Sequence, residues 1–146
     1  MTPEKTSGIK LHIGVDTNGL PHAMWVTTAD ETDRIGALEM CSHEFSYLTK
    51  VKKLLVDSGY SGADFAEAIE SLLDAEVEVV KRSELRTFKV MPRRWVVERT
   101  FGWLDKCREL WKNCERKLHN SLQMAKIAFI CIILKNSKQT LRNASK

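Results

Sequence analysis

The sequence predicts an α/β fold, in which strands alternate with helices and an antiparallel hairpin lies at one edge of the sheet. Residues 9–15 alternate apolar and polar side chains, which is the period of a half-buried strand. A short apolar run at residues 54–56 and a valine-rich stretch at residues 76–80 enclose a segment with helical spacing. Residues 94–118 and 121–134 carry helical patterns, so we expect a carboxyl-terminal helical pair after the strands.

The first strand is expected to turn back on itself. Asn18-Gly19 favours a type I′ hairpin turn, which needs positive φ at both central residues. A second strand over residues 21–28 and a helix over about 34–43 should follow. Asp16 precedes the turn, and we expect it to be a structural residue of the hairpin.

The second half of the chain contains the longest predicted helix. Residues 63–73 have helical spacing, and residues 81–91 read as a basic connector that stops at Pro92. From Arg94 to about Leu118 we predict one amphipathic helix with a single apolar stripe, formed by Val97, Phe101, Leu104, Trp111 and Leu118.

The chain of 146 residues is long enough for one compact domain. We assign residues 1–8 to a disordered terminus, residues 9–135 to the domain and residues 136–146 to a polar tail. No signal peptide is visible, and the apolar run 127–134 is too short to span a bilayer. The four cysteines lack C-x-x-C spacing, so a zinc site or a disulfide framework is not expected. A cytoplasmic protein with free thiols and no membrane contact is predicted.

Charge is distributed unevenly along the chain. Residues 1–80 contain six Lys/Arg and fourteen Asp/Glu, residues 81–117 twelve and five, and residues 118–146 five and none. An acidic first half and a basic second half fit a protein that grips a polyanion with one face. Ordinary solvated helix faces account for the same counts, and charge alone slightly favours them.

Two carboxylates could carry chemistry. Asp57 directly follows the apolar run 54–56, at the carboxyl edge where open α/β sheets bind ligands. A turn aspartate that accepts a hydrogen bond from its own backbone explains Asp57 more simply. Glu98 shares a predicted helix face with Arg94, Gly102 and Asp105. An exposed Arg94–Glu98 ion pair, worth about 0.2–0.5 kcal/mol, explains Glu98 equally simply.

Several stretches in combination resemble a known family. They are His12–Pro21 (HIGVDTNGLP), Leu55–Tyr60 (LVDSGY), Lys81–Glu84 (KRSE), Val90–Leu104 (VMPRRWVVERTFGWL) and Arg108–Arg116 (RELWKNCER). Together they are similar to the DDE transposases of bacterial insertion sequences, in the insertion-sequence four and five group. The likeness extends over roughly residues 8–135 and implies a ribonuclease-H-like catalytic domain.

The resemblance implies roles for the two carboxylates. Asp57 and Glu98 match the second and third acids of a triad that holds two Mg²⁺ (or Mn²⁺) ions, which stabilise charge during phosphodiester cleavage. Arg94 matches a family arginine, but Asp105 stands where a basic residue is expected and Met91 where a tyrosine is. The residues expected to contact DNA phosphates are Arg93, Arg94, Arg99, Lys106 and Arg108.

The first acid of the family triad has no counterpart in this sequence. The resemblance places it on a central strand just before the hairpin, whereas Asp16 matches a different family position. We therefore expect an incomplete ribonuclease-H-like sheet. A truncated or split reading frame, with an upstream product that supplies the strand, would explain the gap.

The leading hypothesis is the carboxyl-terminal portion of a DNA transposase that cleaves and joins DNA at insertion-sequence ends and is inactive alone. Its expected partners are transposon-end and target DNA, an upstream fragment or intact transposase, and a second copy of the chain. One alternative is a non-catalytic DNA-binding or regulatory transposase fragment, and another is the product of a decayed gene.

Overall fold

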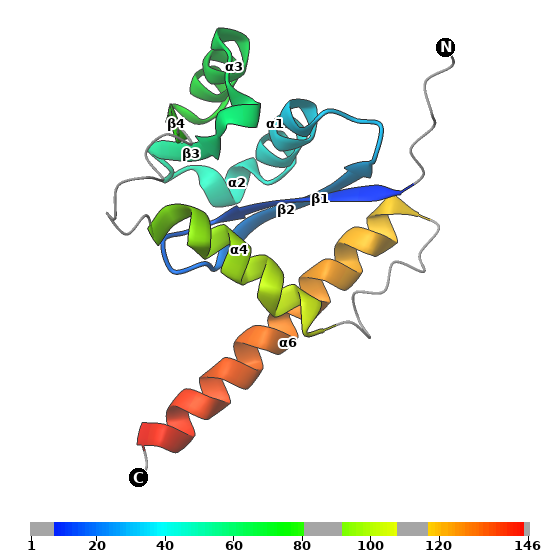
Figure 1. The fold of residues 1–146 in the computed structure, drawn as a ribbon, viewed down its shortest axis with the longest axis vertical. Coiled ribbons are helices and arrows are strands. Elements are labelled where there is room, and N and C mark those ends of the chain that lie inside the picture. Colours follow the sequence, from blue (N-terminus) through cyan, green and yellow to red (C-terminus); the bar gives the residue numbers. More distant parts are fainter. Residues whose placement is uncertain (1–7, 81–91, 108–116, 145–146) are drawn as a thin grey trace.

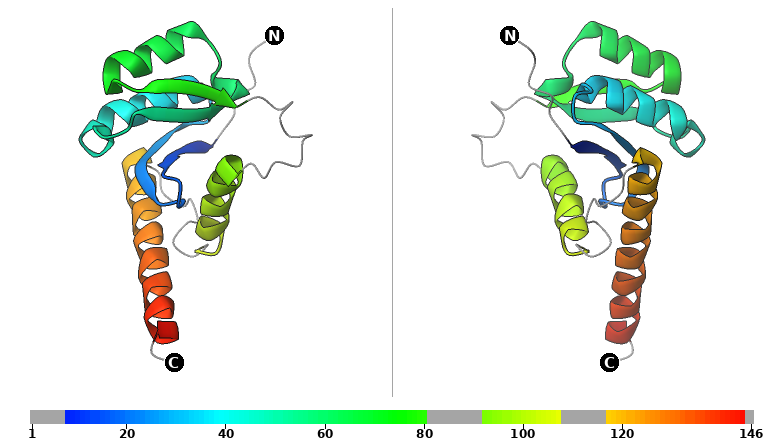
Figure 2. Two further views of the ribbon diagram at one scale, coloured as in Figure 1. Left: turned by 90° about the vertical axis from the view of Figure 1, so that its left-hand side faces the viewer. Right: turned by 90° about the vertical axis from the view of Figure 1, so that its right-hand side faces the viewer.

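The computed structural model describes residues 8–80, 92–107 and 117–144. A β-hairpin runs through the middle of the molecule (Figure 1). On one side of it lie α1, α2, α3 and the β3–β4 pair, and on the other side lie α4 and α6 (Figures 1 and 2). The predicted α/β class, with an antiparallel hairpin, parallel strands and carboxyl-terminal helices, is confirmed.

The hairpin consists of β1 (Ile9–Val15) and β2 (Pro21–Thr28), as the sequence predicted. Its turn differs from the predicted type I′ turn, because of the two central residues only Gly19 has positive φ, at 83°. The Gly19 amide donates to the Asp16 carbonyl oxygen (3.0 Å), and the strand register shifts between Gly14 and Val15. A three-residue loop with one left-handed glycine and a bulge therefore replaces the two-residue turn.

Asp16 has the structural role that was predicted. Its Oδ1 accepts hydrogen bonds from the amides of Asn18 (2.8 Å) and Leu20 (2.9 Å). Burial raises the pKa of the Asp16 carboxyl, but the hydrogen bonds from these amides, together with His22, outweigh it and leave the pKa lowered. The carboxylate thus holds the loop closed.

Parallel strands form a second pair. β3 (Lys53–Asp57) and β4 (Glu76–Val80) are joined by α3 (Ala63–Leu73), all within a residue or two of the predicted bounds. Before them come α1 (Asp33–His43) and the short α2 (Phe45–Leu48). In the described part of the chain, β1–β2 and β3–β4 are two separate two-stranded sheets.

One apolar core connects the two sheets. Helix α1 packs against the hairpin and against α3, the helix that joins β3 to β4. The core combines buried side chains of β2, α1 and α3, with half-buried side chains of β3 and β4 packed around it: Ala23, Ala37, Met40, Cys41, Phe65, Ile69, Leu54, Val56 and Val77. Side-chain packing therefore holds the two strand pairs together, as backbone hydrogen bonds hold the strands of a continuous sheet.

The single long helix predicted for residues 94–118 is wrong. Helix α4 (Pro92–Asp105) ends in a tight turn, in which the amide of Lys106 donates to the Trp103 carbonyl oxygen (3.2 Å) and that of Cys107 to the Leu104 carbonyl oxygen (2.8 Å). These bonds span three residues rather than four, so the helix tightens and stops.

The apolar stripe predicted for this helix is also wrong in part. Leu104 is buried, but Phe101 is 38% exposed, and the buried face carries Val96 and Thr100 instead. Two of the five residues counted in the stripe lie beyond the end of α4: Leu118 belongs to the next helix, and Trp111 lies outside the described residues. The prediction chose the wrong buried face for α4, because it continued one regular spacing of apolar residues past the end of the helix.

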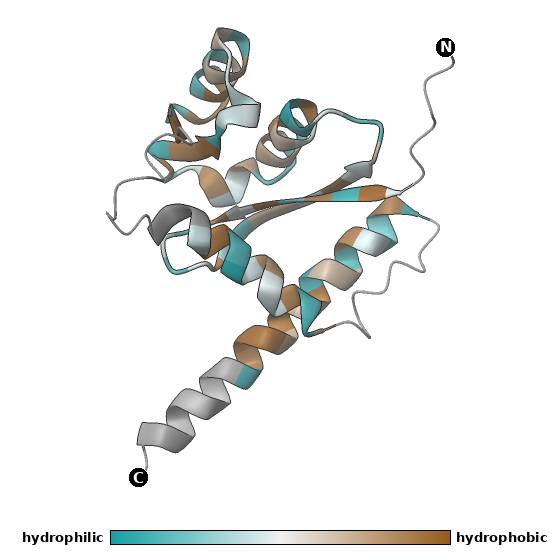
Figure 3. Ribbon diagram, viewed as in Figure 1, coloured by the Kyte–Doolittle hydropathy of each residue, from teal (hydrophilic) through white to brown (hydrophobic). Residues whose placement is uncertain are grey.

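Helix α6 (Leu118–Ala144) begins three residues before the predicted 121–134 helix and continues beyond it. Its first half packs across β2, with buried Leu122, Ala125, Ala128 and Phe129. Its carboxyl-terminal half projects from the body, and brown, hydrophobic residues continue into this part (Figure 3). No helix in the described residues is long and apolar enough to cross a membrane.

Two helical glycines make a test of the packing of α1. A Cβ built on Gly36 would lie 2.2 Å from His12 Nε2, whereas one built on Gly102 of α4 meets nothing within 4 Å. We expect Gly36→Ala to destabilise the chain by about 1–3 kcal/mol, because the helix must move off the strand. Gly102→Ala should stabilise it by about 0.5–1 kcal/mol through helix propensity. Urea unfolding of both variants measures this difference, and equal responses would contradict it.

His12 should make the stability of the fold depend on pH. The side chain is buried, and its Nε2 lies 3.0 Å from Thr27 Oγ1. Burial lowers the pKa of His12; Asp33 and Glu39 oppose this change and Lys10 adds to it. The folded state therefore binds the proton less readily than the unfolded state, in which the pKa is about 6.5. Neutral His12 therefore contributes its full stabilisation above a pH of about 6.5. This stabilisation is lost as the pH falls towards the lower pKa that His12 has in the folded state. Thermal unfolding at pH 7.5 and 5.5 should show a smaller decrease for His12→Gln than for the unsubstituted chain.

Candidate active site

Asp57 is the last residue of β3 and lies at the carboxyl end of the parallel pair. Its side chain is exposed, and its Oδ1 accepts a hydrogen bond from the Gly59 amide (2.8 Å). This bond caps the short 3₁₀ turn Ser58–Tyr60 that follows β3. Arg34 at the start of α1 donates from Nε to the Gly59 carbonyl oxygen (3.2 Å). The Asp57 carboxylate is therefore both a turn residue and an exposed group in a turn that α1 braces.

Tyr60 lies in the same turn. Burial raises the pKa of the Tyr60 hydroxyl, and the negative charges of Asp33 and Asp57 raise it further. Two acidic side chains, at the start of α1 and at the end of β3, thus lie near a partly buried phenol. Cations lie there too, because Lys10 pairs with Asp33 (3.0 Å) and Arg34 donates to the same turn.

Glu98 lies on the exposed face of α4. Gly102, one turn further on, is exposed and leaves open space beside the helix. Asp105 ends α4, and Lys106 follows it; both are exposed. The side chain of Arg94, the predicted ion-pair partner of Glu98, lies outside the described residues.

The end of the strand that carries Asp57 lies on the same side of the molecule as the beginning of the helix that carries Glu98. The carboxyl end of the β3–β4 pair and the first turn of α4 are on one side in both views of Figure 2. Carboxylate oxygens such as those of Asp57 and Glu98 are the ligands that Mg²⁺ prefers. Within residues 8–80, 92–107 and 117–135, however, no three His, Cys, Asp or Glu side chains are grouped to hold a metal ion. The type of donor fits such an ion, and the number of donors falls short.

The predicted phosphate-binding residues differ in their surroundings. Lys106 is exposed, whereas Arg108 and the side chains of Arg93 and Arg94 lie outside the described residues. Arg99 is engaged within the protein, because its Nη2 donates to the carbonyl oxygen of Asn18 in the hairpin loop.

The sequence prediction missed a stack of three side chains on α4. The guanidinium carbon of Arg99 lies 4.6 Å from the ring centroid of Trp95 and 5.0 Å from that of Trp103, so the cation lies between two indoles. The signal was available, because an arginine with tryptophans four residues before and after it places all three side chains on one helix face.

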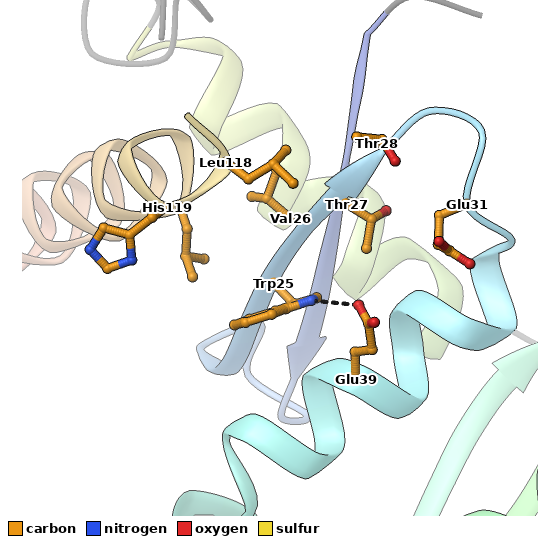
Figure 4. Close-up of a pocket in the computed structure, with 9 residues that line it drawn as sticks. Trp25, Val26, Thr27, Thr28, Glu31, Glu39, Leu118 and His119 are labelled. Carbon is orange, nitrogen blue, oxygen red and sulfur yellow. Dashed lines mark hydrogen bonds between the residues drawn. The ribbon is translucent and has the colours of Figure 1, made fainter. Parts of the chain in front are cut away.

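One hollow of about 270 Å³ lies apart from these residues, between β2, α1 and the start of α6 (Figure 4). Within it Trp25 donates from Nε1 to Glu39 Oε2 (2.9 Å) and stacks on His43, with ring centroids 4.1 Å apart. The residues that line the hollow are Trp25, Val26, Thr27, Thr28, Glu31, Glu39, Leu118, His119 and Leu122. None of the predicted site residues is among them.

Comparison with known proteins identifies the family. The model of the transposase DDE domain matches residues 2–134, which is most of the chain. A search among curated proteins found no match. With two exposed carboxylates at the end of β3 and on α4, and with a domain model that matches nearly its whole length, this chain belongs to the transposase DDE domain family.

Proposed function

We propose that this chain is the carboxyl-terminal portion of the catalytic domain of a DNA transposase of the insertion-sequence four and five group. The match of the transposase DDE domain over residues 2–134 carries this proposal. Asp57 and Glu98 are its second and third catalytic acids. Their exposure, at the end of a strand and on a helix face, leaves both carboxylates accessible to a metal ion and to DNA.

The reaction is the cleavage and transfer of a DNA strand at the ends of an insertion sequence. Bound Mg²⁺ (or Mn²⁺) ions supply charge neutralisation at the phosphoryl group and activation of the attacking hydroxyl. Asp57 and Glu98 would hold such ions through their carboxylate oxygens. Lys106 and the arginines at 93, 94 and 108 orient the DNA by contacts with its phosphates, which carry no sequence information.

A third acid comes from outside the described residues. The two strand pairs share one apolar core but no backbone hydrogen bonds. The Leu54–Val56 run of β3 is apolar on consecutive residues, which is typical of a strand covered on both faces and flanked by neighbours. Among the described residues, however, β3 pairs with β4 alone. An inserted strand would satisfy backbone groups that a two-stranded pair leaves unpaired. In this proposal an upstream segment supplies that strand together with its aspartate, and the chain is inactive without it.

A non-catalytic role is the second candidate. Residues 81–146 contain seventeen Lys/Arg and five Asp/Glu, and the described residues hold no complete metal cluster. A DNA-binding fragment that regulates an intact transposase would use these charges without chemistry. We place either form in the bacterial cytoplasm, where the DNA is.

Self-association is part of the same proposal. Ile127, Ile130 and Leu134 are 45%, 56% and 57% exposed on α6, and they are one and two helical turns apart. An exposed apolar stripe of this kind supports an interface with a second copy of the chain or with an intact transposase.

Complementation tests the catalytic proposal. The chain is combined with a segment that contains the proposed upstream strand and its aspartate, and Mg²⁺-dependent nicking of element-end DNA is measured. We expect no nicking by the chain alone and nicking by the combination. Asp57→Asn and Glu98→Gln should each reduce the rate by about a thousandfold, since a metal contributes several kcal/mol to such a transition state.

Glu67→Gln is the matched control, because Glu67 is an exposed acid on α3 that has no part in the proposed site. It should leave the rate unchanged. Metal-dependent nicking by the isolated chain, or full activity of Asp57→Asn, would contradict the catalytic proposal. Two results together would favour the regulatory role. Salt-sensitive DNA binding would persist in Glu98→Gln without Mg²⁺, and no upstream segment would activate nicking by the chain.

A further inference from the structure

Two adjacent side chains of α4 bind the loop of the β-hairpin. Arg99 donates from Nη2 to the Asn18 carbonyl oxygen, and Thr100 donates from Oγ1 to the Gly19 carbonyl oxygen (2.8 Å). Thr100 is fully buried, and its Oγ1 also lies within hydrogen-bond distance of the Val96 carbonyl oxygen (3.0 Å). We call these bonds between Arg99, Thr100 and the loop the hairpin clasp.

Gly19 permits the close approach that the clasp needs. Its φ of 83° is a left-handed conformation, and a Cβ at this position would lie 2.9 Å from Arg99 Nη2 and 3.1 Å from Thr100 Oγ1. A larger residue would be strained and would also push the helix away. The loop and the helix are therefore shaped to each other at a single residue.

The tryptophan stack holds the guanidinium in place. Arg99 lies between Trp95 and Trp103, one turn away on either side, and its Nε is buried without a hydrogen-bond partner. A buried guanidinium N–H is costly unless other interactions compensate, and two cation–π contacts do so here. The Nε edge of the Arg99 guanidinium is thus buried, and its Nη2 is bonded to the hairpin loop.

We propose that Arg99 and Thr100 are positioning residues for Glu98, and that Arg99 does not contact DNA phosphate. This inference rests on the proposed role of Glu98 as a metal ligand. Glu98 immediately precedes Arg99, so the clasp fixes the rotation of α4 about its axis and with it the direction in which the Glu98 carboxylate points. A misplacement of about 1 Å can reduce catalysis roughly a hundredfold, so this direction has to be set firmly.

Hydrogen exchange on the full chain tests the clasp without any activity. The amides of Asn18, Gly19 and Leu20 all donate to Asp16 within the loop. We expect Arg99→Gln and Thr100→Val to increase their exchange roughly tenfold or more, because the loop loses a charge-assisted or a buried hydrogen bond. Arg99→Lys should recover part of the protection, since a lysine can donate to Asn18 but cannot stack as a planar cation. Lys106→Gln, which removes an exposed charge next to α4, should change nothing in the loop.

DNA binding separates a clasp from a phosphate contact. Removal of a residue that contacts phosphate reduces, by about one, the slope of log K for DNA binding against the logarithm of the salt concentration. Lys106→Gln should show that reduction, and Arg99→Gln should keep the slope of the unsubstituted chain. A reduced slope in Arg99→Gln with unchanged exchange of the loop would overturn the inference and make Arg99 a phosphate ligand.

Mn²⁺ alone reports on Glu98 itself. Paramagnetic broadening of the Glu98 resonances should need several-fold more Mn²⁺ in Arg99→Gln and Thr100→Val than in the unsubstituted chain, while broadening at Asp57 is unchanged. A merely structural role would weaken both acids or neither, and Arg99→Lys should restore part of the effect. Glu98 broadening that is identical in all variants, despite a loosened loop, would overturn the positioning role. Absence of Mn²⁺ broadening at Glu98 in the unsubstituted chain would contradict the proposed function and with it the positioning role, while the exchange result still decides whether the clasp exists.

Discussion

The apolar core beneath α1 is the constraint on which the rest of this structure depends. In the described residues the hairpin and the parallel pair share no backbone hydrogen bonds, so their mutual arrangement relies on side-chain packing. Packing of this kind is sensitive to single atoms. Gly36 lies so close to His12 that even a methyl group would separate α1 from the hairpin. The same helix braces the turn after β3 through Arg34, and so the position of Asp57 depends on how α1 sits on the hairpin.

Glu98 depends on the hairpin through a different set of contacts. Helix α4 reaches the loop between β1 and β2 through Arg99 and Thr100, on the side of the hairpin opposite α1. The two proposed acids are therefore located from one common frame, Asp57 by way of α1 and Glu98 by way of the clasp. Each of the two residues is thus tied to the hairpin by its own set of contacts.

Local patterns predicted the local elements well. The strand at residues 9–15 and the helix at residues 63–73 were predicted with the bounds observed, because alternation and helical spacing report on one element at a time. The end of α4 at Asp105 was missed, because apolar residues recur at helical spacing in the sequence on both sides of it. The role of Arg99 was missed for another reason: its partner Asn18 is eighty-one residues away, and charge alone suggested solvent or DNA. The roles of Asp57 and Glu98 stay predictions, because they depend on a metal and on a third acid.

The two explanations of Asp57 that the sequence left open are compatible. Its Oδ1 accepts the Gly59 amide, as a turn aspartate does, but a carboxylate has four lone-pair sites on two oxygens, and one hydrogen bond leaves most of them available. The turn bond also fixes the rotation of the side chain, so the exposed oxygen has a defined direction before any ion arrives. A ligand that is already oriented loses less entropy on binding a metal, which is the same advantage that the clasp gives to Glu98. For Asp57, a hydrogen bond that looks merely structural is therefore compatible with the predicted role as a metal ligand.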